Sequence, residues 1–407
     1  MRTELLARIR DPNLWRIYRT TLALGLAYGL SISLLAVFLD LKGFNKSDIG
    51  SLAAWFASGI VAASIPAGYL IRRFSAKAML VVSLTGYALT VTAFPFVTDI
   101  WSLSLLRFVD GAFSVGAWIS LETLLLARAD ADSKAFVTSI YAVAMAVGYV
   151  VGPLGARALA AVLPLYWGFV CAGVIALGAA IYVVFAMGQD PLATHSSAAE
   201  PRGAGGKNPD GNALLWRIKT SCLGTFAYGY FQASVVLFLP LFLMGEKGIA
   251  REQTIIIPAF FAFGMLLFSN YAGRLGDRYG HLMLMRVLAI VGGSMTLGFV
   301  FLDSFALMCS AVFVAGASLA SISPLSLALQ GLQTAPGEYS RATALYNAFY
   351  ALGMLGGPVI SSRIFEHSGG ASMLYHLALL WLTFIIFTMV FYRDDPRVQG
   401  QAALSSS

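Results

Sequence analysis

The feature that most constrains the fold of this chain is a series of separate apolar runs, most of them long enough to cross a membrane. An α-helix of about 20 residues spans the hydrocarbon core of a bilayer. The 407 residues are 58% hydrophobic and only 12% charged. Inside a bilayer the backbone has to bond to itself, so isolated spanning runs form helices. We therefore predict an all-α integral membrane protein with short loops.

The apolar runs predict twelve membrane-spanning helices in two sets of six. The first six are expected near 14–39, 48–70, 77–97, 100–127, 135–159 and 164–187. The second six are expected near 214–244, 253–275, 281–302, 304–330, 339–363 and 371–392. A polar stretch rich in Gly, Pro, Ser and Ala separates the sets and is typical of a flexible linker. The predicted domains are thus a first half at 1–187, a linker at 188–213, a second half at 214–392 and a polar tail at 393–407.

The basic residues predict how the chain is oriented. Most arginines and lysines fall in segments that share one side with both chain ends and the linker. Because basic residues favour the cytoplasmic side, both termini are expected in the cytoplasm. The chain itself is expected in the cytoplasmic (inner) membrane. The net charge of +7 does not indicate a nucleic-acid partner, since no basic segment carries interleaved aromatic residues.

Several classes of chemistry have no signature in this sequence. The three cysteines lie within apolar runs and lack the spacing of a zinc site or a disulfide framework. There is no phosphate-binding loop of the GxxxxGK[ST] type, and no Ser-His-Asp set is visible. We therefore expect a protein that is not an enzyme, with no cofactor, no metal and no ATP site.

The two halves repeat each other in sequence. Ala27-Tyr28-Gly29 recurs 200 positions later, whereas Tyr141 recurs as Tyr346 at a spacing of 205. The same spacing of 205 relates Gly148, Gly152 and Pro153 to Gly353, Gly357 and Pro358. Five extra residues in the second half predict a longer loop after its first helix. Two six-helix pseudo-repeats in one orientation, with a site between them, are a transporter architecture.

The fourth predicted helix carries charges within an apolar run. Charged residues at membrane depth are costly and usually functional. Arg107 and Asp110 are three residues apart and can pair on one helix face. Glu122 lies twelve residues beyond Asp110, and we expect all three side chains near one side of the helix. They are the candidates for proton coupling, against the alternative that the pair only anchors the helix end.

Five further polar residues at membrane depth are candidates to line a substrate cavity. They are Tyr28, Tyr228, Gln232, Tyr346 and Asn347. The alternative for each is a hydrogen bond to a neighbouring helix, which is the commoner use of such residues.

Two loops carry the first resemblance to a known family. The segment Gly273-Arg274-Leu275-Gly276-Asp277-Arg278-Tyr279-Gly280 resembles the signature loop of the major facilitator superfamily. Its first-half counterpart, Gly68-Tyr69-Leu70-Ile71-Arg72-Arg73-Phe74-Ser75, has Arg72 where the second loop has Asp277. The resemblance implies that these loops lock and release the two halves. The candidate switch residues are Gly68, Arg72, Arg73, Gly273, Gly276, Asp277, Arg278 and Gly280, and Arg72 is expected to pair with Glu338.

The fourth and fifth helices extend the resemblance. Arg107, placed four residues before Gly111, matches the superfamily's fourth-helix motif, and together with Glu122 it is similar to the YcaD-like bacterial branch. The run from Gly148 to Pro153 resembles the superfamily's antiporter motif, which implies an exporter. The alternative is that these residues serve only helix packing, as would their repeat mates: Gly148, Gly152, Pro153, Gly353, Gly357 and Pro358.

The leading interpretation is a secondary active transporter that exports small organic molecules by alternating access, coupled to protons. Glu122 would take up a proton when the cavity closes around it. A neutral or cationic amphiphile fits an acid-bearing aromatic cavity better than a strongly anionic substrate. The alternatives are an uptake symporter or facilitator, and a transporter-like membrane sensor without flux. The expected partners are the substrate, protons and the lipid bilayer, and the family resemblance implies a monomer.

Overall fold

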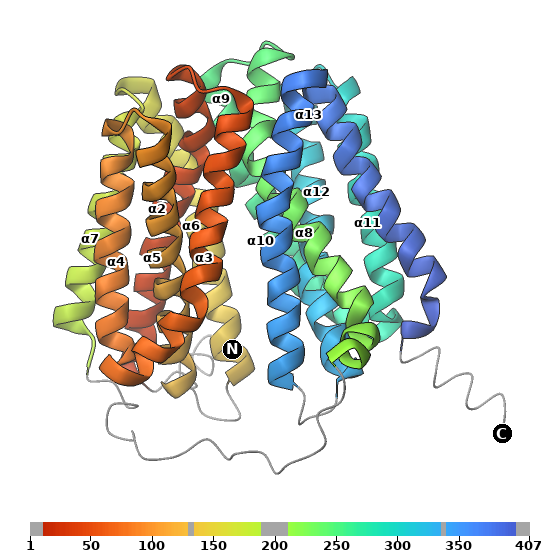
Figure 1. Cartoon of the computed structure of the whole chain (residues 1–407), viewed down its shortest axis with the longest axis horizontal. Helices are drawn as coiled ribbons and strands as arrows, with labels where there is room; N and C mark the ends of the chain where they lie inside the picture. The colour runs from red at the N-terminus through yellow and green to blue at the C-terminus, as the bar shows by residue number, and fades with distance from the viewer. Residues whose placement is uncertain (1–10, 129–133, 189–210, 335–338, 396–407) are drawn as a thin grey trace. The chain divides into compact units, whose positions relative to one another are not determined.

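The computed structural model describes residues 11–128, 134–188, 211–334 and 339–395. This part of the chain is helical and contains no β-strand (Figure 1). The first half holds α2 (Pro12–Leu41), α3 (Lys46–Phe74), α4 (Ala76–Ala93), α5 (Ile100–Arg128), α6 (Lys134–Val162) and α7 (Tyr166–Ala186). The second half holds α8 (Gly211–Gly245), α9 (Arg251–Thr254), α10 (Ile257–Tyr279), α11 (His281–Gly298), α12 (Phe305–Gln333) and α13 (Tyr339–Val390). The prediction of an all-α membrane protein is confirmed, since eleven of the described helices are long and apolar enough to span a bilayer.

The last two predicted spans are the two helices within α13, which meet at a sharp break. The helix is interrupted only at Gly369, whose φ of 84° lies in the left-handed region that favours glycine. Beyond the break, the Glu246 carboxylate accepts hydrogen bonds from the backbone N–H groups of Gly370 and Ala371. These are the first free N–H groups of the new helix, so the chain reverses without a separate loop.

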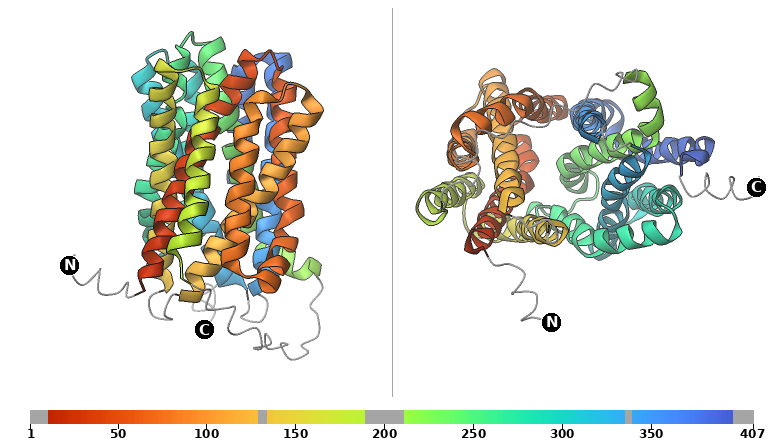
Figure 2. Two further views of the ribbon diagram at one scale, coloured as in Figure 1. Left: turned by 90° about the vertical axis from the view of Figure 1, so that its left-hand side faces the viewer. Right: turned by 90° about the horizontal axis from the view of Figure 1, so that it is seen from below.

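The chain separates into two compact units that follow the two halves, except that 45–50 groups with the second and 250–259 with the first. In the first unit α2 packs against α6 and α7, and α4 packs against α5 and α7. In the second, α8 packs against α12 and α13, and α11 packs against α12 and α13. The turned views in Figure 2 show that the helices of each half run roughly side by side. Between α8 and α10, the short helix α9 lies in the loop that the sequence predicts to be longer than its first-half counterpart.

Glycines let α2 and α6 approach closely. A Cβ on Gly148 would come within 2.7 Å of the backbone of Gly25, and one on Gly152 would meet Gly29 at 2.6 Å. In the second unit, a Cβ on Gly353 would meet the Phe226 carbonyl oxygen of α8 at 2.3 Å. A side chain would therefore push the helices apart at each of these positions.

A second glycine crossing lies between α3 and α5 and was not anticipated from the sequence. A Cβ on Gly111 would meet the Phe56 carbonyl oxygen at 2.0 Å, and one on Gly59 would meet that of Phe108 at 1.9 Å. The second unit repeats the crossing at positions 205 residues later, where Gly316 meets Phe261 and Gly264 meets Phe313. This close approach brings the ring of Phe56 to the charged segment of α5.

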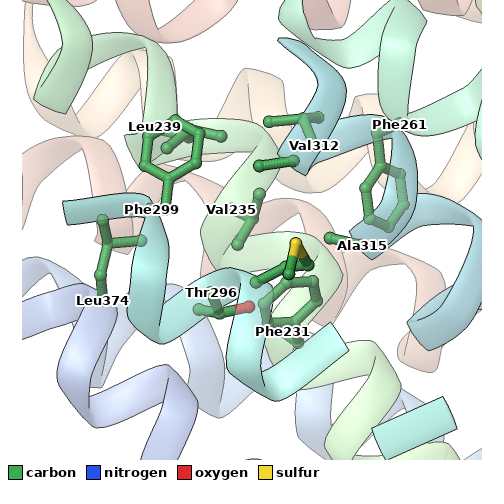
Figure 3. A pocket seen from close by; sticks show the side chains of 11 residues that line it. Phe231, Val235, Leu239, Phe261, Thr296, Phe299, Val312, Ala315 and Leu374 are labelled. Carbon is green, nitrogen blue, oxygen red and sulfur yellow. The ribbon is translucent and has the colours of Figure 1, made fainter. Parts of the chain in front are cut away.

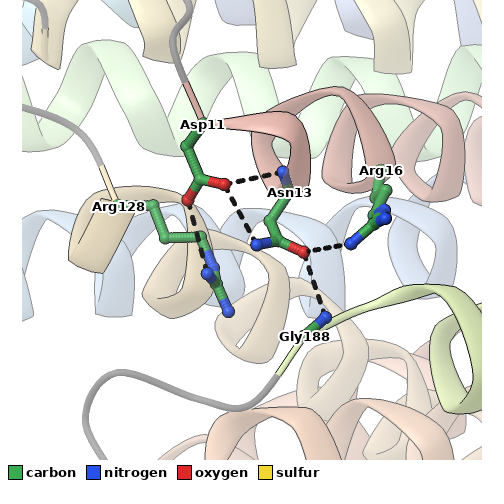
Figure 4. Close-up of polar contacts among 5 residues, drawn as sticks. All are labelled: Asp11, Asn13, Arg16, Arg128 and Gly188. Carbon is green, nitrogen blue, oxygen red and sulfur yellow. Dashed lines mark hydrogen bonds and ion pairs between the residues drawn. The ribbon is translucent and has the colours of Figure 1, made fainter.

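Polar side chains tie the beginning of the first half to its end (Figure 4). Asp11 caps α2 and accepts a hydrogen bond from Arg128, the last residue of α5, at 3.4 Å. Asn13 accepts from the backbone N–H of Gly188, which follows α7, at 3.0 Å. The second half has a comparable tie, because Asp394 pairs with Lys219 of α8 and accepts through its carbonyl from Gln333 of α12. The two ends of each half therefore lie together, as an even number of spans requires.

Candidate functional site

The charged segment predicted on the fourth helix lies on α5 and forms an intrahelical ion pair. Arg107 Nη1 donates to Asp110 Oδ2, and the two side chains are only 12% and 8% exposed. The guanidinium carbon of Arg107 also lies 4.3 Å from the centre of the Phe56 ring on α3. Cation–π contacts of this kind gain strength when water is excluded. Arg107 is thus held between a carboxylate and an aromatic face.

Tyr28 of α2 lies at the centre of an aromatic group beside this pair. Its ring centre is 4.6 Å from that of Tyr87 on α4 and 5.6 Å from that of Trp118 on α5. Tyr149 of α6 stacks on Tyr28 with an angle of 17° between the ring planes. Tyr87 shares a 3.1 Å hydrogen bond with Ser31, one turn after Tyr28. Four helices of the first half therefore contribute to one aromatic wall.

Buried polar side chains lie close together beside the ion pair. Ser114 is fully buried, and its hydroxyl lies against the polar groups of Tyr28 and Asp110, which are buried too. Arg107 Nε has no hydrogen-bond partner among the described residues. Unpaired buried polar groups cost about 1–3 kcal/mol each and are therefore rare unless they serve a purpose.

Glu122 lies on the same helix as Asp110 but in different surroundings. Asp110 is buried, whereas the side chain of Glu122 is exposed. No described cation lies within ion-pair distance of Glu122, and its electrostatic neighbour is the hydroxyl of Tyr141 on α6. Twelve residues correspond to about 3.3 turns, so the two acids point about 120° apart. The expectation that they share one side of the helix is wrong for this reason.

A row of side chains nevertheless links the two acids. Asp110, Ser114, Trp118 and Glu122 recur every four residues, and each step turns the row by about 40°. The row begins at the buried ion pair, passes the aromatic wall at the half-buried Trp118 and ends at the exposed carboxylate. α5 therefore carries one acid that is buried and one whose side chain is exposed.

The cavity candidates of the second half form a separate polar group. Tyr228 stacks on Tyr350 with ring centres 6.1 Å apart, and its hydroxyl donates to Met265 Sδ at 3.9 Å. The Tyr350 hydroxyl donates to Gln232 Oε1 at 3.1 Å. The sequence interpretation did not include Tyr350, which gives Gln232 its partner.

Tyr346 and Asn347 have different surroundings although they are adjacent in sequence. Tyr346 is 5% exposed and donates to the carbonyl of Ser323 on α12 at 2.8 Å. Its hydroxyl also lies 3.0 Å from Ser326 Oγ. Asn347 is exposed. Tyr346 therefore links α13 to α12, whereas the side chain of Asn347 remains accessible.

The second half holds an apolar cavity where the first half holds the ion pair (Figure 3). Val312 and Ala315 line it, and they stand 205 residues after Arg107 and Asp110. Phe261, the counterpart of Phe56, lines it too. The cavity is small, with a volume of about 20 Å³, and lies between α8, α10, α11, α12 and α13. The same helix positions are thus charged in the first half and apolar in the second.

The two candidate switch loops are described in part. Arg73 lies over the ring of Phe74, the last residue of α3. Arg278 lies over the ring of Tyr279, the last residue of α10. The side chains of Arg72 and Asp277, and Glu338 as a whole, lie outside the described residues. The described glycines differ in their surroundings. Gly68 and Gly273 face open space, Gly276 packs against Leu325, and Gly280 has a φ of 102°.

The sequence interpretation missed the residues that surround the ion pair. Tyr87, Ser114, Trp118 and Tyr149 were not among the candidates. The four-residue recurrence from Asp110 to Glu122 is a signal that could have identified Ser114 and Trp118. Tyr87 and Tyr149 belong to other helices, and their roles depend on how those helices pack.

Comparison with known proteins agrees with this architecture. The family model described as Major Facilitator Superfamily matches residues 20–219 and 221–406. The uncharacterised MFS-type transporter YfkF of Bacillus subtilis is 22% identical over 369 residues, covering 89% of this chain and 92% of that protein. The uncharacterised MFS-type transporter YcaD of Escherichia coli is 22% identical over 353 residues, covering 85% and 87%.

Among solved structures, the nucleoside transporter NupG superposes with a TM-score of 0.78 at 13% sequence identity. The match covers 94% of this chain and 99% of NupG. At this identity the likeness concerns the fold alone.

Proposed function

The chain belongs to the major facilitator superfamily and is a multi-pass membrane transporter, and we propose that it couples the export of small organic molecules to protons. Transport would proceed by alternating access, in which the two halves move about a central site. The switch loops, including Arg72, Arg73, Asp277 and Arg278, would lock and release that movement. In this proposal the protein acts as a monomer in the cytoplasmic membrane, with both termini in the cytoplasm.

The observation that carries the coupling proposal is the buried Arg107–Asp110 pair, in which Arg107 Nε has no hydrogen-bond partner among the described residues. Breaking a buried ion pair leaves an uncompensated charge, which is strongly unfavourable. Protonation of Asp110 would release Arg107 from the pair, and Arg107 would then need another acceptor. A conformational change that supplies or removes that acceptor would be linked to the proton. In this proposal the proton and the movement depend on each other through Arg107.

Glu122 gives a second proton acceptor nearer to water. A carboxylate that faces the substrate path through the membrane is stable as an anion while water reaches it. When the path closes, loss of that water favours the neutral, protonated acid. Glu122 and Asp110 would then exchange protons with opposite sides of the membrane, at different stages of the transport cycle. The described residues of the second half have apolar side chains at both equivalent positions, Leu327 and Ala315, which supports coupling through the first half.

The direction of transport is supported by the glycine run on α6. Gly148, Gly152 and Pro153 all lie against α2, as close packing of the antiporter type requires. Uptake by symport or facilitated diffusion is the alternative, and it would lead to substrate accumulating inside cells. A membrane sensor that binds without flux is a further alternative.

A thermal-stability screen of the purified protein tests the proposal. Drugs, metabolites and peptides would be screened at pH 5.5 and 8.5 on wild type, Glu122→Gln and Asp110→Asn. We expect at least one ligand to stabilise wild type in a pH-dependent way, with that dependence lost in one of the variants. Ligands whose effect ignores both pH and the substitutions would contradict proton coupling and favour a facilitator. Counterflow in proteoliposomes, with the pH gradient imposed in either direction, then tests flux and its direction.

A further inference from the structure

We propose that the substrate is an organic cation, bound through Glu122 and the adjoining aromatic wall of the first half. This inference rests on the proposed function and names the substrate class of that site. Glu122 follows Trp118 by four residues, so both lie along one side of α5. Trp118 and Tyr149 both contact Tyr28, and Tyr141 of α6 interacts with Glu122. A carboxylate beside aromatic faces is the usual recognition site for an ammonium or similar cation.

The exposure of Glu122 favours a ligand over a structural role. A structural carboxylate in a spanning helix is normally paired with a cation or with backbone donors. Among the described residues no such partner lies within bonding distance of Glu122. The equivalent residue of the second half, Leu327, is 44% exposed, so this helix position is open in both repeats. An ionised acid at an open position needs water or a cationic ligand beside it.

The basic residue of the same region is not available to an anion. Arg107 is already paired with Asp110 and lies over Phe56. Binding an anionic group there would require breaking a buried ion pair, which is strongly unfavourable. The half-buried rings of Trp118 and Tyr149 meanwhile offer aromatic surface, which attracts positive charge. The charge balance of the site therefore selects cations and rejects anions.

The test compares two probe ions of the same shape and opposite charge, tetraphenylphosphonium and tetraphenylborate. Binding of each radiolabelled ion to the protein in nanodiscs is measured at pH 8, with empty nanodiscs subtracted. Wild type should bind the phosphonium ion at least tenfold more tightly than the borate ion. Glu122→Gln should weaken phosphonium binding at least tenfold and change borate binding less than twofold. Glu122→Asp, which keeps the charge, should stay within about threefold of wild type.

Asp99→Asn is the matched control, since it also removes one carboxylate from the first half but lies outside the spans. It should leave the binding of both ions within twofold of wild type. The inference is overturned if wild type binds the borate ion as tightly as the phosphonium ion, or if Glu122→Gln binds the phosphonium ion unchanged.

Flux of the same probe separates this inference from the proposed function. Phosphonium binding that depends on Glu122, without movement across proteoliposomes under a pH gradient, would support the cation site and contradict transport. Proton-driven flux of an uncharged compound, without phosphonium binding, would support transport and contradict the cation site.

Discussion

Ser75 and Gly280 occupy equivalent positions in the two halves, and both have a positive φ, of 111° and 102°. Each residue begins the third helix of its half, immediately after a switch loop. Only glycine adopts this backbone region without strain, and strain at a non-glycine residue costs of order 1–3 kcal/mol. Ser75 partly compensates by accepting a hydrogen bond from the Ala78 N–H at 3.2 Å.

We predict that Ser75→Gly stabilises the protein. Relief of strain should contribute about 1 kcal/mol or more, whereas replacing a serine cap by glycine costs only a few tenths of a kcal/mol. The apparent melting temperature in detergent should therefore rise. Gly280→Ser is the reciprocal control and should lower it. A lower melting temperature for Ser75→Gly would mean that the cap outweighs the strain.

The glycine crossing of α3 and α5 gives a second prediction. Gly111→Ala should destabilise the first half, because the new methyl group would meet the Phe56 carbonyl oxygen at 2.0 Å. Overpacking of this kind costs about 1–3 kcal/mol and would also displace Phe56 from Arg107. Gly178→Ala, at a helical glycine that faces open space, is the control and should be neutral. Equal melting temperatures for the two variants would show that α3 moves away without cost.

The sequence predicts the fold class and the repeat because both depend on local patterns. Hydrophobic run length identifies spanning helices, and the 205-residue spacing identifies the halves. The ion pair of Arg107 and Asp110 also follows from local spacing. The expectation that Glu122 shares a side with Asp110 is wrong because twelve residues make about 3.3 turns, a third of a turn beyond a whole number. The row of four-residue steps through Trp118 shows how the helix turns between the two acids.

The remaining parts of the candidate site depend on packing between helices. Tyr87 and Tyr149 join the wall around Tyr28 only because the packing of the first half brings these residues of α4 and α6 to it. The sequence shows that Val312 and Ala315 replace the charged residues of the first half, but it does not show that a cavity lies beside them. The sequence predicts the two helices within α13, but it does not reveal that Glu246, more than 120 residues away, caps the second of them.

That cap is the basis of a third prediction. Glu246→Gln should weaken the reversal at Gly369, since a neutral amide accepts more weakly from the two N–H groups than a carboxylate does. The expected loss is about 1 kcal/mol, as for other helix caps. Hydrogen exchange at Gly370 and Ala371 should become faster before exchange elsewhere in α13 changes. Glu252→Gln, in an exposed pair with Arg251, should leave these amides unchanged.

A fourth prediction concerns acid stability at the beginning of α5. The backbone N–H of Ser102 donates to Asp99 Oδ1 at 2.8 Å and, with the Ser102 side chain, lowers the pKa of the Asp99 carboxyl. The folded protein therefore binds this proton less readily than the unfolded chain, so the stabilisation is present above the usual aspartate pKa. It is lost as the pH falls through the lowered pKa. Between about pH 5 and pH 3 the melting temperature should fall less steeply in Asp99→Asn than in wild type, and equal slopes would contradict the assignment.

The last prediction separates the structural role of the Arg107–Asp110 pair from its proposed role in coupling. Asp110→Asn leaves the Arg107 charge buried without its partner, which should destabilise the protein by about 3–5 kcal/mol. The double variant Arg107→Met with Asp110→Leu removes both charges from an apolar site and should recover most of that loss. The second half shows that this helix position accepts such residues, since Val312 and Ala315 stand there.

If the pair serves coupling, the double variant should be nearly as stable as wild type in thermal unfolding. It should nevertheless lose the pH dependence of substrate flux in proteoliposomes. Full proton-driven flux in the double variant would show that the pair is only structural, and the coupling would then have to reside at Glu122. A double variant less stable than Asp110→Asn would show instead that the contact between Arg107 and Phe56 makes the larger contribution.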